Sequence, residues 1–190
     1  DTEDDFVVVA GTGEQIISIG DVAMDSYYNT MYAEPITADV SNNTRINAFS
    51  YGATFAEIEV DLRTGKIEII DITNIHDCGT VINPKTAEGQ VFGGMSMGIG
   101  QALTEDLKFS PKDGRCLNPN LLDYKIPTAM DTPNMHCHFI DSHDPTSSYG
   151  QKSLGEPPTL SPAPAIRNAL LHATGVAMND LPLSQQRVFE

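Results

Sequence analysis

The stretch "AEIEVDLRTGKIEIIDITNIHD", residues 56–77, decides the fold of this chain. Ala56, Ile58 and Val60 alternate with acidic residues, which is the period of a strand with one buried and one exposed face. "RTG" at 63–65 supplies a short turn, and "KIEIIDITNIHD" at 66–77 returns as a second strand rich in β-branched residues. The sequence therefore predicts an antiparallel hairpin.

Other segments predict further strands and helices on both sides of this hairpin. We expect strands at 6–10 and in "MHCHFID" at 135–141, and a helix at 19–28. A second helix follows Ser161, which we expect to cap it, and ends at Gly175. Hairpin strands interrupted by helices predict an α+β fold, with helices packed on one face of a mixed or antiparallel sheet. We expect one domain over 1–190, with the N-terminal strand joining the sheet.

The segment "NPKTAEGQVFGGMSMGIGQALTE" predicts a glycine-rich helix over 84–105, with Asn83 as its N-cap. Each glycine should weaken an isolated helix by about 1 kcal/mol relative to alanine, so something must pack closely along the bare backbone. Tight packing against a neighbouring helix or sheet is one explanation, and a large planar ligand or cofactor is the other. Two sets of these glycines share a face: Gly89, Gly93 and Gly100, and beside them Gly94 and Gly98.

The composition excludes several classes of function. The chain has 190 residues and a formal net charge of -15, which argues against nucleic acid and anionic membrane surfaces as partners. No apolar run approaches the roughly 20 residues that a membrane span needs. Three widely spaced cysteines fit neither a disulfide framework nor a zinc or iron–sulfur site, and favour a reducing cytoplasm. His136 and His138 share one face of a strand without a third ligand, so no metal site is predicted.

Two polar side chains are candidates for chemistry. Glu156 stands between Gly155 and two prolines in "KSLGEPPTLSP", where Pro157 should hold it in extended geometry and apolar neighbours should desolvate its carboxylate. Such a carboxylate suits a general base, although a residue that only ends a turn or caps a helix would also fit this position. Gln90 lies on the glycine-rich helix and could bond a polar ligand, or serve as an ordinary surface or inter-helix amide.

An ordered set of motifs resembles the late segment of the molybdenum-binding subunit in the xanthine dehydrogenase family of molybdenum hydroxylases. The likeness runs from about Ala53 to Val188. It is carried, in order, by "ATFAEIEVDLRTGKIEI", "DCGTVINP", "EGQVFGGMSMGIGQAL", "LDYKIPTAMDTPN", "KSLGEPPTLSPAPAIRNAL" and "VAMNDLPLSQQRV". The resemblance implies the same α+β fold and a molybdopterin cofactor.

The resemblance also implies roles for individual residues. Glu156 matches the family's glutamate beside the molybdenum centre, which acts as the base, with Gly155 and the two prolines in register. Gln90 matches the glutamine that contacts the molybdopterin side of the site, and Gly89 and Gly93 match the glycines of the same motif.

The same resemblance implies what lies outside this chain. Most of the molybdopterin is expected to be held by upstream polypeptide, and iron–sulfur clusters and FAD by partner chains or domains. The chain alone is therefore expected to be inactive. Its expected substrate is a purine or related N-heterocycle, hydroxylated at an electron-poor carbon with water as the oxygen source. The alternatives are an aldehyde, nicotinate or carbon monoxide oxidoreductase of the same family, or a scaffold module that has lost the chemistry.

Overall fold

The computed structural model describes residues 1–28, 36–41 and 46–189. The chain divides into two compact units, Asp1–Asn43 and Thr44–Glu190. Among the described residues no helix is both long enough and apolar enough to cross a membrane. The single domain that we expected over residues 1–190 stays a prediction.

The first unit holds its own small sheet. Strands β1 (Thr2–Glu3), β2 (Phe6–Val8) and β3 (Gln15–Ser18) pair antiparallel in that order, and helix α1 (Ile19–Tyr28) follows at once. The predicted helix at 19–28 is confirmed. Our expectation that the N-terminal strand joins the main sheet is wrong, because β2 is paired on both sides by its sequence neighbours. Gly11 and Gly13, with φ of 90° and 68°, form the turn that returns the chain beside β2.

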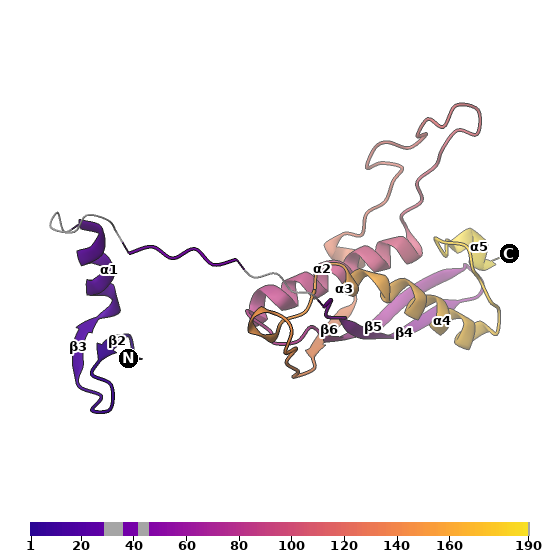
Figure 1. Ribbon diagram of the computed structural model, residues 1–190. Coiled ribbons are helices and arrows are strands. Elements are labelled where there is room, and N and C mark those ends of the chain that lie inside the picture. The colour runs from indigo at the N-terminus through magenta and orange to yellow at the C-terminus, as the bar shows by residue number, and fades with distance from the viewer. Residues whose placement is uncertain (29–35, 42–45, 190) are drawn as a thin grey trace. The chain divides into compact units, whose positions relative to one another are not determined.

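The second unit is built on a mixed three-stranded sheet. Strands β4 (Tyr51–Asp61) and β5 (Lys66–Asp77) form the antiparallel hairpin that the sequence predicted. Strand β6 (Asn134–Phe139) then pairs with β5 in parallel, which gives the order β4-β5-β6 (Figure 1). The strand in "MHCHFID" is thus confirmed.

An irregularity in the hairpin keeps the apolar face of β5 continuous. Ile69 pairs with Ile58, but Asp71 pairs with Glu57, so Ile70 is an extra residue on β5. Along β5 the side chains that face the helices therefore belong to odd-numbered residues before Ile70 and to even-numbered residues after it. Ile72 is fully buried as a result. The bulge lets Ile67, Ile69, Ile72, Asn74 and His76 all face the helices.

Two helices cover one face of this sheet, as predicted. Helices α2 (Pro84–Leu103) and α4 (Pro162–Thr174) lie over it, and the short α3 (Pro157–Leu160) packs against α2 (Figure 1). Burying a side chain such as Ile or Leu contributes about 1.5–3 kcal/mol, so the shared core stabilises the layers as one unit. The buried core cluster is Ile72, Val91, Met95, Ile99, Ala102, Ala163, Ile166, Leu170 and Leu183.

The helix ends follow the sequence in part. Asn83 caps α2 by accepting the Thr86 N–H at 3.2 Å, and Gly175, with φ of 75°, ends α4. Helix α2 stops at Leu103, two residues short of our expectation. Ser161 holds the N-cap position of α4 without capping it through its side chain. Its hydroxyl lies 2.6 Å from Thr54 Oγ1 instead, since α3 precedes it directly and keeps its backbone helical.

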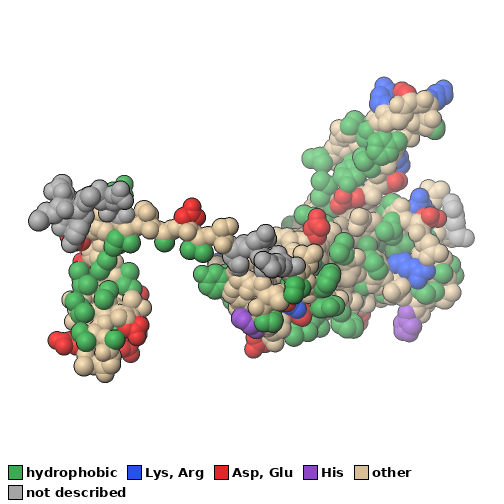
Figure 2. All heavy atoms as spheres, viewed as in Figure 1, with side chains coloured by type: hydrophobic (Ala, Val, Ile, Leu, Met, Phe, Trp, Pro, Cys, Tyr) green, Lys and Arg blue, Asp and Glu red, His purple; other side chains and the backbone are tan. Residues whose placement is uncertain are grey.

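A long excursion separates α2 from β6. It contains the 3-10 helix η1 (Ala129–Asp131), and a second 3-10 helix, η2 (Ser148–Gly150), follows β6. Figure 2 shows hydrophobic side chains along the excursion and basic side chains at the tip that projects farthest from the sheet. The chain closes with the short helix α5 (Gln185–Phe189), whose first residue lies against Gly65 in the hairpin turn.

Candidate cofactor-facing site

The glycines of α2 divide into a packed group and an open group. A Cβ atom added at Gly94 would lie 2.5 Å from Pro158 Cβ, and one at Gly98 would lie 2.8 Å from Pro162 Cβ. Gly100 is likewise crowded by Glu105 and Pro127. Close packing of α2 against α3 and α4 therefore explains Gly94 and Gly98, and contact with the segment that follows α2 explains Gly100.

The open group consists of the glycines that the resemblance assigned to the cofactor. A Cβ atom at Gly89, Gly93 or Gly155 would meet no described atom within 4 Å. Gly89 and Gly93 are four residues apart on α2 and expose bare backbone on one side of the helix. Packing against the described residues does not account for them, so the second explanation, a ligand or another polypeptide, remains for these three positions. Gly100, which we placed on their face, belongs to the packed group.

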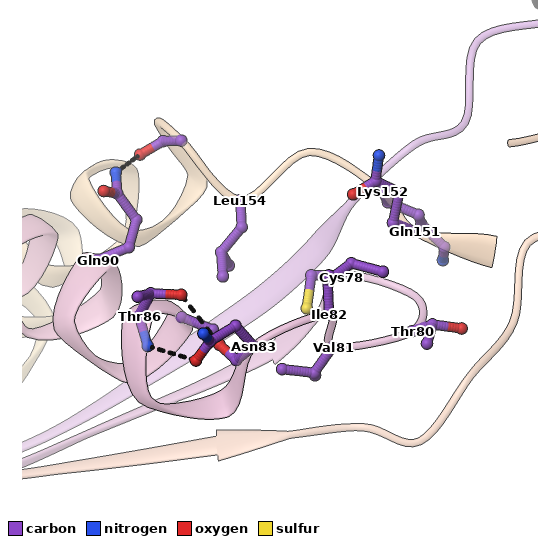
Figure 3. Close-up of a pocket in the computed structure, with 12 residues that line it drawn as sticks. Cys78, Thr80, Val81, Ile82, Asn83, Thr86, Gln90, Gln151, Lys152 and Leu154 are labelled. Atoms are coloured by element: carbon purple, nitrogen blue, oxygen red, sulfur yellow. Dashed lines mark hydrogen bonds between the residues drawn. The ribbon is translucent and has the colours of Figure 1, made fainter. Parts of the chain in front are cut away.

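A single hydrogen bond joins two of the predicted cofactor residues. The Nε2 atom of Gln90 donates to the carbonyl oxygen of Gly155 at 2.6 Å, across 65 positions of sequence (Figure 3). Gln90 is exposed, and its Oε1 atom accepts no hydrogen bond from the part of the chain that the structure describes. One acceptor of the amide is thus left for a ligand.

A pocket of about 430 Å³ opens beside this bond. The end of β5, the start of α2 and the segment before α3 line it (Figure 3). Cys78 contributes a buried thiol, whose pKa is raised by desolvation. The lining residues are Cys78, Thr80, Val81, Ile82, Asn83, Thr86, Ala87, Gln90, Gln151, Lys152, Leu154 and Gly155.

Glu156 follows Gly155 directly but differs from our expectation in two respects. Its backbone is helical, with φ of -95° and ψ of -29°, because it starts α3 and its carbonyl accepts the Thr159 N–H at 2.9 Å. This bond offsets the usual preference of a residue before proline for extended geometry. The Glu156 side chain is exposed and makes no hydrogen bond or ion pair with other described residues. The apolar burial that we expected from its neighbours is therefore not supplied by the described residues.

A charged cluster that the sequence did not indicate lies at one end of the pocket. Lys152 Nζ contacts Asp77 Oδ2 at 2.6 Å, and the two side chains are only 10% and 19% exposed. Ser142 Oγ and the Gly79 N–H both donate to Asp77 Oδ1. Hydrogen bonds from Lys152 and Ser142 hold the pKa of Asp77 down at about 2. The two partners are 75 positions apart, so no local pattern marks them.

The histidines form no metal centre in the described part of the chain, which holds no group of three or more His, Cys, Asp or Glu side chains able to bind a metal ion. His136 and His138 are exposed on one side of β6 and Cys137 points to the other side, as the strand period predicted. His136 Nε2 contacts Asp71 Oδ2 at 2.9 Å instead. His76 is buried beside Gly52, and desolvation lowers its pKa.

Comparisons with known proteins identify the family of this chain. The model of a molybdopterin cofactor-binding domain matches residues 2–133. The putative xanthine dehydrogenase molybdenum-binding subunit XdhA of Escherichia coli K12 is 46% identical over 97% of this chain and 25% of its own length. The nicotine 6-hydroxylase large subunit of Paenarthrobacter nicotinovorans is 30% identical over 98% of this chain and 24% of its own length.

A solved structure also shares the fold. A Cu,Mo-CO dehydrogenase superposes with a TM-score of 0.85 and 26% sequence identity, covering 100% of this chain and 24% of that protein. The chain belongs to the molybdopterin cofactor-binding domain family, as the motifs indicated. It spans about a quarter of the length of these relatives.

Proposed function

We propose that this chain supplies the catalytic base and one wall of the molybdopterin site in a molybdenum hydroxylase. The main observation in support of this proposal is the hydrogen bond between Gln90 and Gly155. It joins the open-glycine side of α2 to the segment that bears Glu156. All five residues assigned from the resemblance thereby belong to one region: Gly89, Gln90, Gly93, Gly155 and Glu156.

The residues present fit a molybdopterin group. Gly89, Gly93 and Gly155 leave backbone uncovered, which permits the close approach of a flat ring system. Gln90 keeps an acceptor that is free among the described residues, and the adjoining pocket combines apolar side chains with polar ones that could orient a ligand. When bound, the molybdenum cofactor would supply the two-electron oxidant for hydroxylation with oxygen from water.

The role of this chain in that reaction is to hold a proton acceptor in place. The Glu156 carboxylate would take a proton from the oxygen nucleophile, and Gln90 would fix the backbone one residue before it. A general base contributes about 10²–10⁴-fold in rate when it lies within hydrogen-bond reach of the proton. We assign the apolar surroundings of this exposed carboxylate to the polypeptide that completes the site.

Because this chain would supply the base and another polypeptide the rest of the site, we propose an assembly of several chains or domains. The remaining molybdopterin-binding polypeptide would hold most of the cofactor, while iron–sulfur and FAD modules would carry electrons away. The subunit designations of the relatives support this assembly. Three free cysteines, two of them partly buried and one buried, support a reducing cytoplasm as its location.

For the substrate we propose a purine or related N-heterocycle, supported by the identity to the xanthine dehydrogenase subunit. Relatives named for an aldehyde and for carbon monoxide keep oxidoreductases of these two classes as alternatives, beside the nicotinate alternative. A scaffold module without chemistry is the alternative of a different class. The presence of both Gln90 and Glu156 in one region argues against it.

The test is turnover by the complete enzyme. This chain is produced with the adjoining molybdopterin-binding polypeptide and its electron-transfer partners. Xanthine, hypoxanthine and nicotinate are then assayed against an artificial electron acceptor. Glu156→Gln should keep its molybdenum and lose at least about 10²-fold in kcat. Glu59→Gln, an exposed glutamate on β4, is the matched control and should keep full activity. Full activity of Glu156→Gln would refute the assignment of the base.

A further inference from the structure

Backbone hydrogen bonds hold the segment 150–155, which leads into Glu156, against residues 78–80 directly after the end of β5. The Lys152 N–H donates to the Cys78 carbonyl at 2.7 Å, and the Thr80 N–H donates to the Gly150 carbonyl at 2.9 Å. Gly79 and Gln151 form an antiparallel bridge between these two bonds. The chain approaching Glu156 is therefore held to residues 78–80 by an isolated β-bridge and its flanking hydrogen bonds.

Close backbone contact accompanies these bonds. A Cβ atom added at Gly79 would collide with the Gly150 carbonyl oxygen, and both glycines have positive φ, 65° and 74°. Only glycine fits both requirements readily. The spacing between this segment and the residues that follow β5 is thus fixed by direct backbone contact.

One ion pair between side chains also joins the segment 150–155 to the end of β5. Lys152 Nζ reaches Asp77 Oδ2 at 2.6 Å, while Ser142 and the Gly79 N–H occupy the other oxygen of that carboxylate. In the other ion pairs of the described residues every side chain is at least 35% exposed, whereas Lys152 and Asp77 are 10% and 19% exposed. Exposed pairs contribute little, but removal of one partner from a buried pair leaves the other charge uncompensated.

Beyond Lys152, the segment is held again on either side of Glu156. Ser50 Oγ donates to the Ser153 carbonyl, and Gln90 Nε2 donates to the Gly155 carbonyl. After Glu156, the Pro158 carbonyl accepts from Asn74 Nδ2 at 3.2 Å. These three contacts are hydrogen bonds between neutral groups. Among the described contacts that hold this segment, the Lys152–Asp77 pair is therefore the charged one.

We infer that Lys152 is a positioning residue for Glu156. Its ion pair with Asp77 fixes the segment 150–155 on the end of β5 and so sets where the Glu156 carboxylate lies. This inference rests on the proposed function of Glu156. Lys152 itself need not touch the reacting atoms, because its ammonium group is engaged by Asp77.

A displaced base predicts a specific kinetic signature. Misplacement of a catalytic group by about 1 Å costs up to about 10²-fold in rate. Lys152→Met keeps the apolar stem and removes the charge, so kcat should fall by about 10- to 100-fold while KM changes less. Lys152→Arg keeps the positive charge and should recover part of the loss.

The test is a double-mutant comparison in the complete enzyme. Lys152→Met is made with and without Glu156→Gln, and kcat, KM and molybdenum content are measured for all four proteins. We expect a loss of at least tenfold in the native background and less than about twofold beside Glu156→Gln, because the base is then already absent. Lys66→Met, which breaks the exposed Lys66–Glu68 pair, is the control and should change kcat by less than twofold.

The outcomes separate this inference from the proposed function. An equal loss in both backgrounds, or no loss with Glu156→Gln still inactive, overturns the positioning role and leaves Glu156 as the base. Full activity of Glu156→Gln overturns both. If Lys152→Met does not accumulate, Ser142→Ala, which removes one donor from Asp77, serves in the same comparison. It should give a smaller loss of kcat with the same dependence on Glu156.

Discussion

The sharpest structural prediction concerns two adjacent glycines of α2. In Gly94→Ala the new Cβ would lie 2.5 Å from Pro158 Cβ, 3.0 Å from the Pro158 carbonyl carbon and 3.1 Å from the Thr159 nitrogen. A proline ring and backbone atoms cannot rotate away, so α2 and α3 must separate. In Gly93→Ala the new Cβ meets no described atom within 4 Å.

The free-energy change follows from two opposing effects. Overpacking a core typically costs about 1–3 kcal/mol, and replacing a helical glycine by alanine stabilises by about 1 kcal/mol. Gly94→Ala should therefore lower the free energy of unfolding by up to about 2 kcal/mol. Gly93→Ala should raise it by up to about 1 kcal/mol in this chain.

Thermal unfolding of the chain measures both effects. At about 2–4 °C per kcal/mol for a chain of this size, Gly94→Ala should lower Tm by several degrees and Gly93→Ala should raise it slightly. In the assembled enzyme, Gly93→Ala should instead reduce molybdenum content, because under the proposed function the added methyl group would project toward the cofactor. If both variants were equally stable, the division into packed and open glycines would be refuted.

Three further predictions follow from side chains near the site. Gln90→Ala removes the bond to Gly155 and should lower the molybdenum content of the assembled enzyme, measured by elemental analysis, with Gln101→Ala as a control on the same helix. Because the pKa of Asp77 is lowered from 3.8 to about 2 in the fold, its contribution, on the order of 2 kcal/mol, is complete above about pH 5 and is lost as the pH falls through about 2. Urea unfolding of Asp77→Asn should lack this part of the pH dependence. Burial raises the pKa of the Cys137 thiol to about 11, so alkylation by iodoacetamide at pH 8, followed by mass spectrometry, should be slow until the chain is unfolded.

Local patterns were sufficient for most of the secondary structure of the second unit. The alternation of Ala56, Ile58 and Val60 predicted the hairpin, and Asn83 and Gly175 marked helix ends that the structure confirms. The bulge at Ile70 had no local signal, because "KIEII" reads as a regular strand. Pairing with β4 and burial against α2 and α4 decide where the alternation changes.

Ser161 and Glu156 show why local rules failed at particular positions. From their immediate neighbours, Ser161 was predicted to cap a helix and Glu156 to be extended before Pro157. In the fold, α3 forms between them, so both backbones are helical and the Ser161 hydroxyl bonds Thr54. For Ser161 a tertiary contact with Thr54 replaced the local cap, whereas Glu156 takes its helical backbone from the local bond with the Thr159 N–H.

By itself, the sequence determined the hairpin, the glycine-rich helix, the charge of the chain and, through its ordered motifs, the family. Each of these depends on residues a few positions apart or on likeness along the chain. Only the tertiary structure decided which glycines are packed and which are open, since that depends on Pro158 and Pro162 across the helix interface. It also decided the Gln90–Gly155 and Lys152–Asp77 contacts, which span 65 and 75 positions. Such contacts arise when strands and helices stack, because packing joins residues according to where their elements meet rather than their distance along the chain.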